Sequence, residues 1–209
     1  MSFSKKFKQL GNVLEELELQ HIIGETFEIT DPLAASDYFK SELRLTLEEV
    51  PYNISEFAIC ETLVYPTLRE VWKNYRKVFN IWSRVMIKLN IKIKGYPDYL
   101  IAKRSPRSPI IFTQPYMAVV EAKLDDFEGA WGQCLFEMWT IQQLNTHKDM
   151  PVYGITTSGL IWQFGKLENG IFTQYETRFT IEEIDRLVSA LNSFFKQCQK
   201  TFTKFENLN

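Results

Sequence analysis

The chain has 209 residues, of which 45% are hydrophobic and 24% charged, and its formal net charge is −2. This composition excludes a disordered, collagen-like or low-complexity protein, and the length fits a single domain over residues 1–209. Three widely spaced cysteines exclude a disulfide framework and a four-cysteine metal site. The sequence shows no signal-peptide core and no apolar run long enough to span a bilayer, so we expect a cytoplasmic protein without a membrane partner.

The charge is distributed unevenly along the chain. Residues 1–68 carry a net charge of −7 and residues 108–209 one of −4, whereas residues 69–107 carry +9. A basic block within an acidic chain is typical of a surface that holds a phosphate backbone, although a solvated strand face gives the same pattern. On the first interpretation, the nucleic-acid-binding side chains are Lys88, Lys92, Lys94, Lys103 and Arg104.

The N-terminal part is predicted to be helical. Apolar residues at helical spacing indicate an amphipathic helix over 3–19, and a second helix is expected over about 34–49. A third is predicted over 55–75, where Pro66 should kink or divide it. Residues 1–54 are therefore expected to form a helical extension that precedes the main core.

Strands follow these helices. Alternating apolar and basic residues predict a strand over 81–93 with one buried and one basic face. Two more strands are predicted over 98–103 and 116–123, then a helix over about 128–145 and a buried strand over 152–156. This order indicates an α/β protein with helices on the faces of a sheet.

The C-terminal part is predicted to close the sheet. Segments 160–167 and 171–179 indicate a hairpin that turns at Asn169 and Gly170. The last helix is predicted to begin with a capping box that starts at Thr180.

Two carboxylates and a lysine are predicted to meet on neighbouring strands. Asp98 opens one strand, and Glu121 and Lys123 are two residues apart on the next, so both side chains point to the same face. If these strands pair as a hairpin, Asp98 approaches Glu121. Two carboxylates supply the oxygen ligands that Mg²⁺ prefers, and Lys123 would orient water or neutralise charge at phosphorus. Solvated charges at strand ends are the alternative interpretation.

In this arrangement the sequence resembles the PD-(D/E)XK nuclease superfamily, which has the restriction-endonuclease-like fold. The resemblance rests on Gly-Tyr-Pro-Asp at 95–98, on Glu-Ala-Lys at 121–123 and on the order of the elements around them. It implies an αβββαβ core over residues 55–165, with a mixed central sheet flanked by helices. Residues 166–209 then form a C-terminal hairpin strand and helix.

The resemblance also implies roles for particular residues. Asp98 and Glu121 would be ligands of Mg²⁺, with Mn²⁺ as a substitute, and Lys123 the catalytic lysine. Members often place another acidic residue on the helix before the first strand, where Glu61 is expected and Glu56 is the other candidate.

A subset of the family carries Gln-x-x-x-Tyr on the helix after the lysine. Gln133 matches the first position of this motif, but residue 137 is Glu where the motif has Tyr. Gln133 is therefore expected near the catalytic residues, behind the metal ligands.

The function expected from these residues is that of a Mg²⁺-dependent DNA endonuclease, which hydrolyses phosphodiester bonds by metal-activated water. The alternative is a DNA-binding or regulatory module that keeps the nuclease fold and does not cut, because fold alone does not fix function. A homodimer formed through the terminal helices is compatible with either function.

Overall fold

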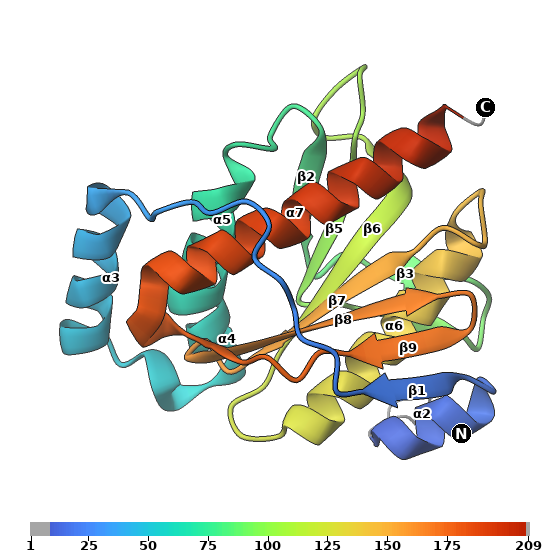
Figure 1. The fold of residues 1–209 in the computed structure, drawn as a ribbon, viewed down its shortest axis with the longest axis horizontal. Helices are drawn as coiled ribbons and strands as arrows, with labels where there is room; N and C mark the ends of the chain where they lie inside the picture. Colours follow the sequence, from blue (N-terminus) through green and yellow to red (C-terminus); the bar gives the residue numbers. More distant parts are fainter. Residues whose placement is uncertain (1–8, 208–209) are drawn as a thin grey trace.

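The computed structural model describes residues 9–207, which form a sheet with helices on both faces (Figure 1). The strands are β1 (Gln20–Ile23), β2 (Phe79–Ser83), β3 (Ile87–Lys88), β4 (Lys94–Gly95), β5 (Tyr99–Arg104), β6 (Phe112–Ala122), β7 (Val152–Thr157), β8 (Ile161–Glu168), β9 (Ile171–Gln174) and β10 (Phe179–Thr180). Within the described residues, the main sheet has eight strands in the order β1-β9-β8-β7-β6-β5-β2, with β10 paired to β8. Strands β3 and β4 form a separate two-stranded ribbon.

The main sheet is mixed. Strands β6 and β7 are parallel, as are β1 and β9, whereas the other neighbouring strands are antiparallel. The expected α/β class, with a mixed central sheet flanked by helices, is therefore confirmed.

The helices lie on both sides of this sheet. They are α2 (Leu10–Glu16), α3 (Asp37–Glu49), α4 (Glu56–Ile59), α5 (Tyr65–Trp72), α6 (Phe127–Leu144) and α7 (Ile184–Glu206). Helix α6 packs on one face, and α4, α5 and α7 pack on the other (Figure 1). Among residues 9–207 no helix is both long enough and apolar enough to cross a membrane. All three cysteines are buried and free, so none is used in a disulfide.

Strand alternation divides the core into two apolar clusters. On β5, Ile101 packs in the cluster beneath α7, whereas Leu100 packs in the cluster beneath α6. On β6, Val120 belongs to the α7 cluster and Val119 to the α6 cluster. Because successive side chains point to opposite faces, Glu121 has the same direction as Val119 and points toward α6.

The strand predicted over 81–93 is wrong as a single element. Strand β2 ends at Ser83, and Arg84 then adopts a left-handed backbone conformation with φ of 50°. Its N–H still donates across to the Asp98 carbonyl at 3.1 Å, and the chain bends at this residue. The alternating residues that follow continue instead in the β3–β4 ribbon, which also has one buried and one exposed face.

The helical extension predicted over 1–54 contains a strand. The described part of its first helix is α2, and residues 1–8 of the prediction lie outside the described residues. Glu18, with φ of 52°, ends the helical segment, and β1 then pairs in parallel with β9. Periodicity missed β1 because it has only four residues.

Two local predictions on the C-terminal side have opposite outcomes. The hairpin turn is confirmed, because Asn169 and Gly170 both have positive φ, as a type I′ turn requires. The capping box is wrong, because the Thr180 side chain makes no capping hydrogen bond and a short 3₁₀ turn precedes α7.

Farther upstream, Pro66 divides its helix as predicted, since a π-helical turn over 60–64 separates α4 from α5.

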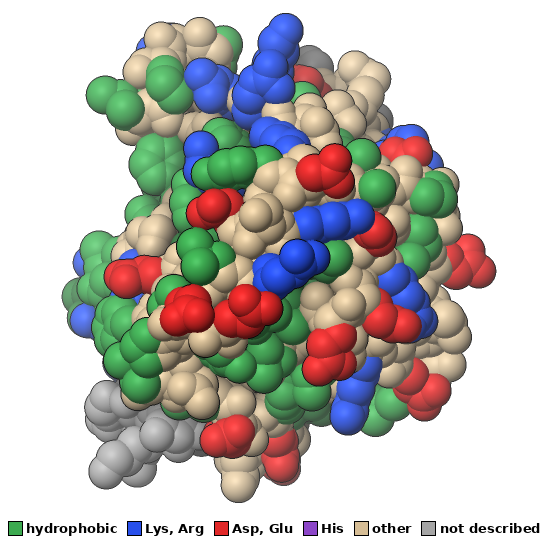
Figure 2. Space-filling view, turned by 90° about the vertical axis from the view of Figure 1, so that its left-hand side faces the viewer, with side chains coloured by type: hydrophobic (Ala, Val, Ile, Leu, Met, Phe, Trp, Pro, Cys, Tyr) green, Lys and Arg blue, Asp and Glu red, His purple; other side chains and the backbone are tan. Residues whose placement is uncertain are grey.

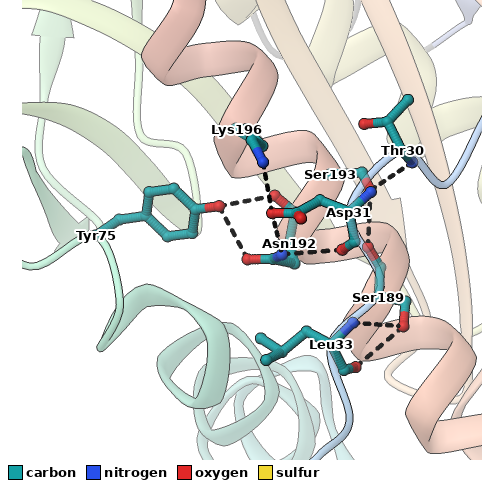
Figure 3. A network of polar contacts seen from close by, with 8 residues as sticks. All are labelled: Thr30, Asp31, Leu33, Tyr75, Ser189, Asn192, Ser193 and Lys196. Atoms are coloured by element: carbon teal, nitrogen blue, oxygen red, sulfur yellow. Dashed lines mark hydrogen bonds and ion pairs between the residues drawn. The ribbon is translucent and has the colours of Figure 1, made fainter.

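The segment that connects β1 to α3 is held along α7 by polar side chains (Figure 3). The hydroxyl oxygens of Ser189 and Ser193 accept hydrogen bonds from N–H groups of residues 30–33, at 3.0 to 3.2 Å. The Asn192 amide donates to a carbonyl of this segment at 2.9 Å and accepts from the Tyr75 hydroxyl at 2.9 Å. These bonds fix the extended segment without a strand or helix of its own.

The face that includes α3 has acidic and basic side chains interspersed, with the basic ones gathered near its upper edge (Figure 2). No single sign of charge therefore dominates this face.

Candidate active site

Asp98 and Glu121 lie together because β5 and β6 pair as predicted. The antiparallel register places Tyr99 opposite Val120, so the residue before β5 lies beside Glu121 near the end of β6. Asp98 Oδ2 accepts a hydrogen bond from the Ala122 N–H at 2.9 Å. The chain therefore fixes this carboxylate at the end of the strand pair.

Arg84 occupies the other side of Asp98. Its Nη2 lies 3.3 Å from Asp98 Oδ1, and its guanidinium carbon lies 3.7 Å from the centre of the Phe57 ring. The Asp98 side chain is only 15% exposed, so this ion pair is partly shielded from water. Arg84 thus neutralises and orients Asp98, while Phe57 stacks on the guanidinium.

Glu121 is buried opposite Glu137, a residue of α6. Glu121 is 1% exposed and Glu137 is 2% exposed. Desolvation is the main cause that raises the pKa of Glu121 well above its ordinary value, followed by the negative charge of Glu137 and a hydrogen bond between the two carboxyls. Desolvation likewise raises the pKa of Glu137. In the absence of a cation, this carboxyl pair is therefore expected to retain a proton near neutral pH.

Each member of the pair has a buried oxygen without a hydrogen-bond partner. These atoms are Oε1 of Glu121 and Oε2 of Glu137, which lack a donor when both carboxyls are ionised, and a proton shared between the two carboxyls supplies the hydrogen bond described above. Glu137 Oε1 accepts from the Tyr96 N–H at 3.0 Å, and a side-chain carbon at Gly95 would lie only 2.4 Å from this oxygen. The Tyr96 hydrogen bond and the close backbone approach at Gly95 thus fix the position of Glu137 Oε1.

Lys123 lies just beyond the end of β6. Its N–H donates to the Thr157 carbonyl at 2.9 Å, and its Nζ lies 3.0 Å from Glu56 Oε2. Desolvation lowers the pKa of Lys123, but the hydrogen bond to Glu56 and the negative charge of Glu121 outweigh it, so the net pKa is raised. Lys123 is therefore a cation at neutral pH.

The two remaining candidates from the sequence occupy different environments. Glu61 is exposed on the π-helical turn, and no described hydrogen bond or ion pair joins it to Lys123. Its competitor Glu56 is the residue that contacts Lys123. Gln133 is half-buried on α6, one helical turn before Glu137 and so on the same side of the helix.

The predicted nucleic-acid-binding residues fall into two groups. Lys88, Lys92 and Lys94 are exposed on the β3–β4 ribbon, which leads directly to the site. Lys103 and Arg104 lie at the opposite end of β5 from Asp98.

The second of these groups already has partners within the chain. Lys103 pairs with Glu206 at 2.6 Å, and Arg104 donates to the Arg76 carbonyl at 3.2 Å. The ribbon lysines are therefore the more available for an external anion.

A divalent cation fits the carboxylates of this site with some of its ligands supplied from outside the protein. In the part of the chain that the structure describes, no three His, Cys, Asp or Glu side chains are placed so that together they could hold a metal ion. Mg²⁺ needs only one or two carboxylates, because water and substrate phosphate complete its shell. The unpartnered Glu121 Oε1 beside Asp98 is compatible with that need.

Comparison with protein-family models and with the sequences of curated proteins found no match.

Sequence reasoning missed Arg84 and Glu137 as site residues. Glu137 had a recognisable signal, because it is the only charged residue between Glu128 and Lys148 and lies in the middle of the predicted helix. Arg84 had none beyond its basic character, since its position depends on a turn that only the folded chain reveals.

Proposed function

We propose that this protein is a Mg²⁺-dependent DNA endonuclease with a restriction-endonuclease-like core. The observation that carries the proposal is the convergence of Asp98, Glu121 and Lys123 where β5 and β6 meet, with a buried Glu121 oxygen that has no partner. The order of elements supports it, because a helix, three strands of the main sheet, a helix and a strand follow one another from α4 to β7.

Asp98 and Glu121 are the residues that would hold Mg²⁺. Their oxygens are the hard ligands that this ion prefers. When bound, the ion would lower the pKa of a water molecule and stabilise negative charge on the scissile phosphate. Arg84 supports this arrangement, because its contact with Asp98 Oδ1 fixes the orientation of that carboxylate.

Lys123 would act on the substrate as a fixed positive charge. Because its pKa is raised, it is protonated when the reaction begins and is poorly suited to remove a proton. It would instead orient the attacking water and stabilise the charge that develops on the phosphate. Glu56 holds the ammonium group in place at 3.0 Å.

The second candidate function is a DNA-binding or regulatory module that does not cut. One observation favours it, because both Asp98 oxygens already accept contacts, one from Arg84 and one from the Ala122 N–H. A metal would have to share these oxygens or displace Arg84.

The test is a titration of Mg²⁺ or Mn²⁺ with plasmid and short duplex DNA, comparing wild type with Glu121→Gln and Asp98→Asn. Gln has the shape of a protonated Glu, so Glu121→Gln should fold and lose only the negative charge. Glu48→Gln, an exposed change on α3, is the matched control.

Metal-dependent nicking by wild type and Glu48→Gln, but by neither site variant, is the expected result. Absence of cleavage together with salt-sensitive DNA binding would favour the non-cutting module. Equal activity in all four proteins would reject the site.

A further inference from the structure

The β3–β4 ribbon forms a compact hairpin over residues 87–95. Ile87 pairs with Gly95 and Lys88 with Lys94. At the tip, Asn90 Oδ1 accepts from the N–H groups of Lys92 and Ile93 at 2.8 and 2.9 Å. Ile87 is buried against the α6 cluster, so the base of the hairpin is anchored and the tip has a defined shape.

The hairpin carries three lysines that form no ion pair with the described residues. From Arg84 to Pro97 the sequence has no acidic residue. Lys88 and Lys94 lie directly opposite each other, which is unfavourable for like charges on paired strands. None of the ion pairs found within residues 9–207 involves Lys88, Lys92 or Lys94. This uncompensated repulsion points to an anion as the partner.

The tip presents an apolar side chain between these charges. Ile91 is 86% exposed, the most exposed of the large hydrophobic residues described. At the base, the Tyr96 hydroxyl donates to Met86 Sδ at 3.2 Å, and both side chains are largely exposed. An isolated apolar tip flanked by lysines suits a ligand that combines charged and apolar surfaces.

The base of the hairpin adjoins the candidate active site. Tyr96 donates its N–H to Glu137, and Asp98 follows two residues later. The four steps from Ile91 to Gly95 span at most about 13 Å, since a strand rises about 3.3 Å per residue. A partner held along the hairpin would therefore lie near Asp98, three residues after Gly95. The DNA major groove, about 12 Å wide, admits a two-stranded ribbon, and the phosphates lie along its edges.

We propose that the 87–95 hairpin enters the major groove of duplex DNA, with Lys88, Lys92 and Lys94 on the phosphates and Ile91 against base edges. The apolar group that the major groove offers is the C5-methyl of thymine, so Ile91 reads thymine there. The inference rests on DNA being the partner in the proposed function, and does not require that the protein cut.

The charge part is tested by fluorescence anisotropy with a labelled duplex in EDTA over a range of salt concentrations. Lys88→Ala/Lys94→Ala should reduce the salt slope of the binding constant by about 2 and weaken binding at 0.1 M salt by roughly 10- to 60-fold. In thermal unfolding, the midpoint temperature of this variant should be no lower than that of wild type, because the change removes a repulsion. Lys200→Ala/Lys204→Ala, which removes two exposed charges from α7, should retain the wild-type slope.

The apolar part is tested with duplexes in which uracil replaces thymine, which deletes the methyl group alone. Wild type should bind the uracil duplex about fourfold more weakly, the loss expected for one buried methyl, whereas Ile91→Ala should bind both duplexes equally. Ile110→Ala, which changes another exposed isoleucine on a different loop, should discriminate as wild type does.

The outcomes separate this inference from the proposed activity. If wild type cuts but both hairpin variants bind like their controls, the hairpin inference is wrong and the nuclease proposal stands. If wild type does not cut and the hairpin variants lose binding as described, the hairpin inference stands and the nuclease proposal is wrong. A wild-type protein that binds no duplex even at low salt would overturn the hairpin inference outright.

Discussion

Two clusters of buried polar side chains differ in how fully they are hydrogen-bonded. In the polar network along α7, whose buried members are Tyr75, Ser189, Asn192 and Ser193, the side-chain oxygens and nitrogens all have partners (Figure 3). In the carboxyl pair, formed by Glu121 and Glu137, each residue has one buried oxygen without a partner.

The difference separates a structural role from a candidate chemical one. A buried polar group with all its hydrogen bonds costs little and fixes one geometry, whereas an unpartnered one destabilises the fold. The polar network along α7 therefore holds residues 30–33 in place. The carboxyl pair is expected to gain its missing partner from a proton or a cation.

The largest expected effect concerns activity. Lys123→Ala should reduce cleavage by roughly 10²- to 10⁴-fold, because it removes the positive charge beside the reacting phosphate. DNA binding should stay within a few-fold of wild type. The ion pair between Lys123 and Glu56 is partly exposed, so the stability of the fold should change little. Cleavage and binding assays side by side check this, with Lys200→Ala as the control. Equal losses in both would assign Lys123 to phosphate binding.

In the polar network along α7, truncation of a side chain to Ala should instead lower the stability of the fold. Asn192→Ala removes a donor to the 30–33 segment and an acceptor for Tyr75, and should lower the free energy of unfolding by about 3 kcal/mol. Urea denaturation measures this. Asn74→Ala, at an exposed position, should be close to neutral. A loss below about 0.5 kcal/mol would mean that the network does not hold the segment.

The carboxyl pair should make the metal-free protein less stable at higher pH. Burial raises the pKa of Glu137 from its ordinary value of 4.5 to about 7. Between these two pH values the folded state therefore binds more protons than the unfolded state. Stability must then fall as pH rises through this window, by about 1.4 kcal/mol for each unit of raised pKa. Glu137→Gln should flatten the fall in chemical denaturation from pH 5 to 8 in EDTA. The same slope in both proteins would contradict the assignment.

The smallest expected effect is that of the metal on stability. Mg²⁺ at ten times its dissociation constant should stabilise the folded protein by about 1.4 kcal/mol. Glu121→Gln should show no such gain in thermal unfolding, whereas Asn192→Ala, although less stable, should show the full gain. A gain shared by Glu121→Gln would place the metal elsewhere.

Local rules predicted the elements that depend on neighbouring residues. The Asn169-Gly170 turn is encoded by two residues that tolerate positive φ, and the division at Pro66 by one residue without an N–H. The order of strands from β5 to β7 followed from their apolar patterns. These features depend on sequence neighbours, so the sequence contains them directly.

Other features depended on contacts between distant parts of the chain. Strand β1 pairs with β9 across about 150 residues, and the bend at Arg84 lies opposite Asp98 on the paired strand. The alternation over 81–93 is identical for one long strand and for a strand followed by a ribbon. A periodicity argument could not choose between them.

The sequence by itself singled out the candidate site residues, because Asp98, Glu121 and Lys123 stand out by type, spacing and strand position. Only the tertiary structure placed Glu137 against Glu121, Arg84 against Asp98 and Glu56, rather than Glu61, against Lys123. The physical reason is that a carboxylate's burial and its charge partners come from elements that are remote in sequence. Those surroundings decide whether it is a solvated charge or a group that holds a proton or a cation.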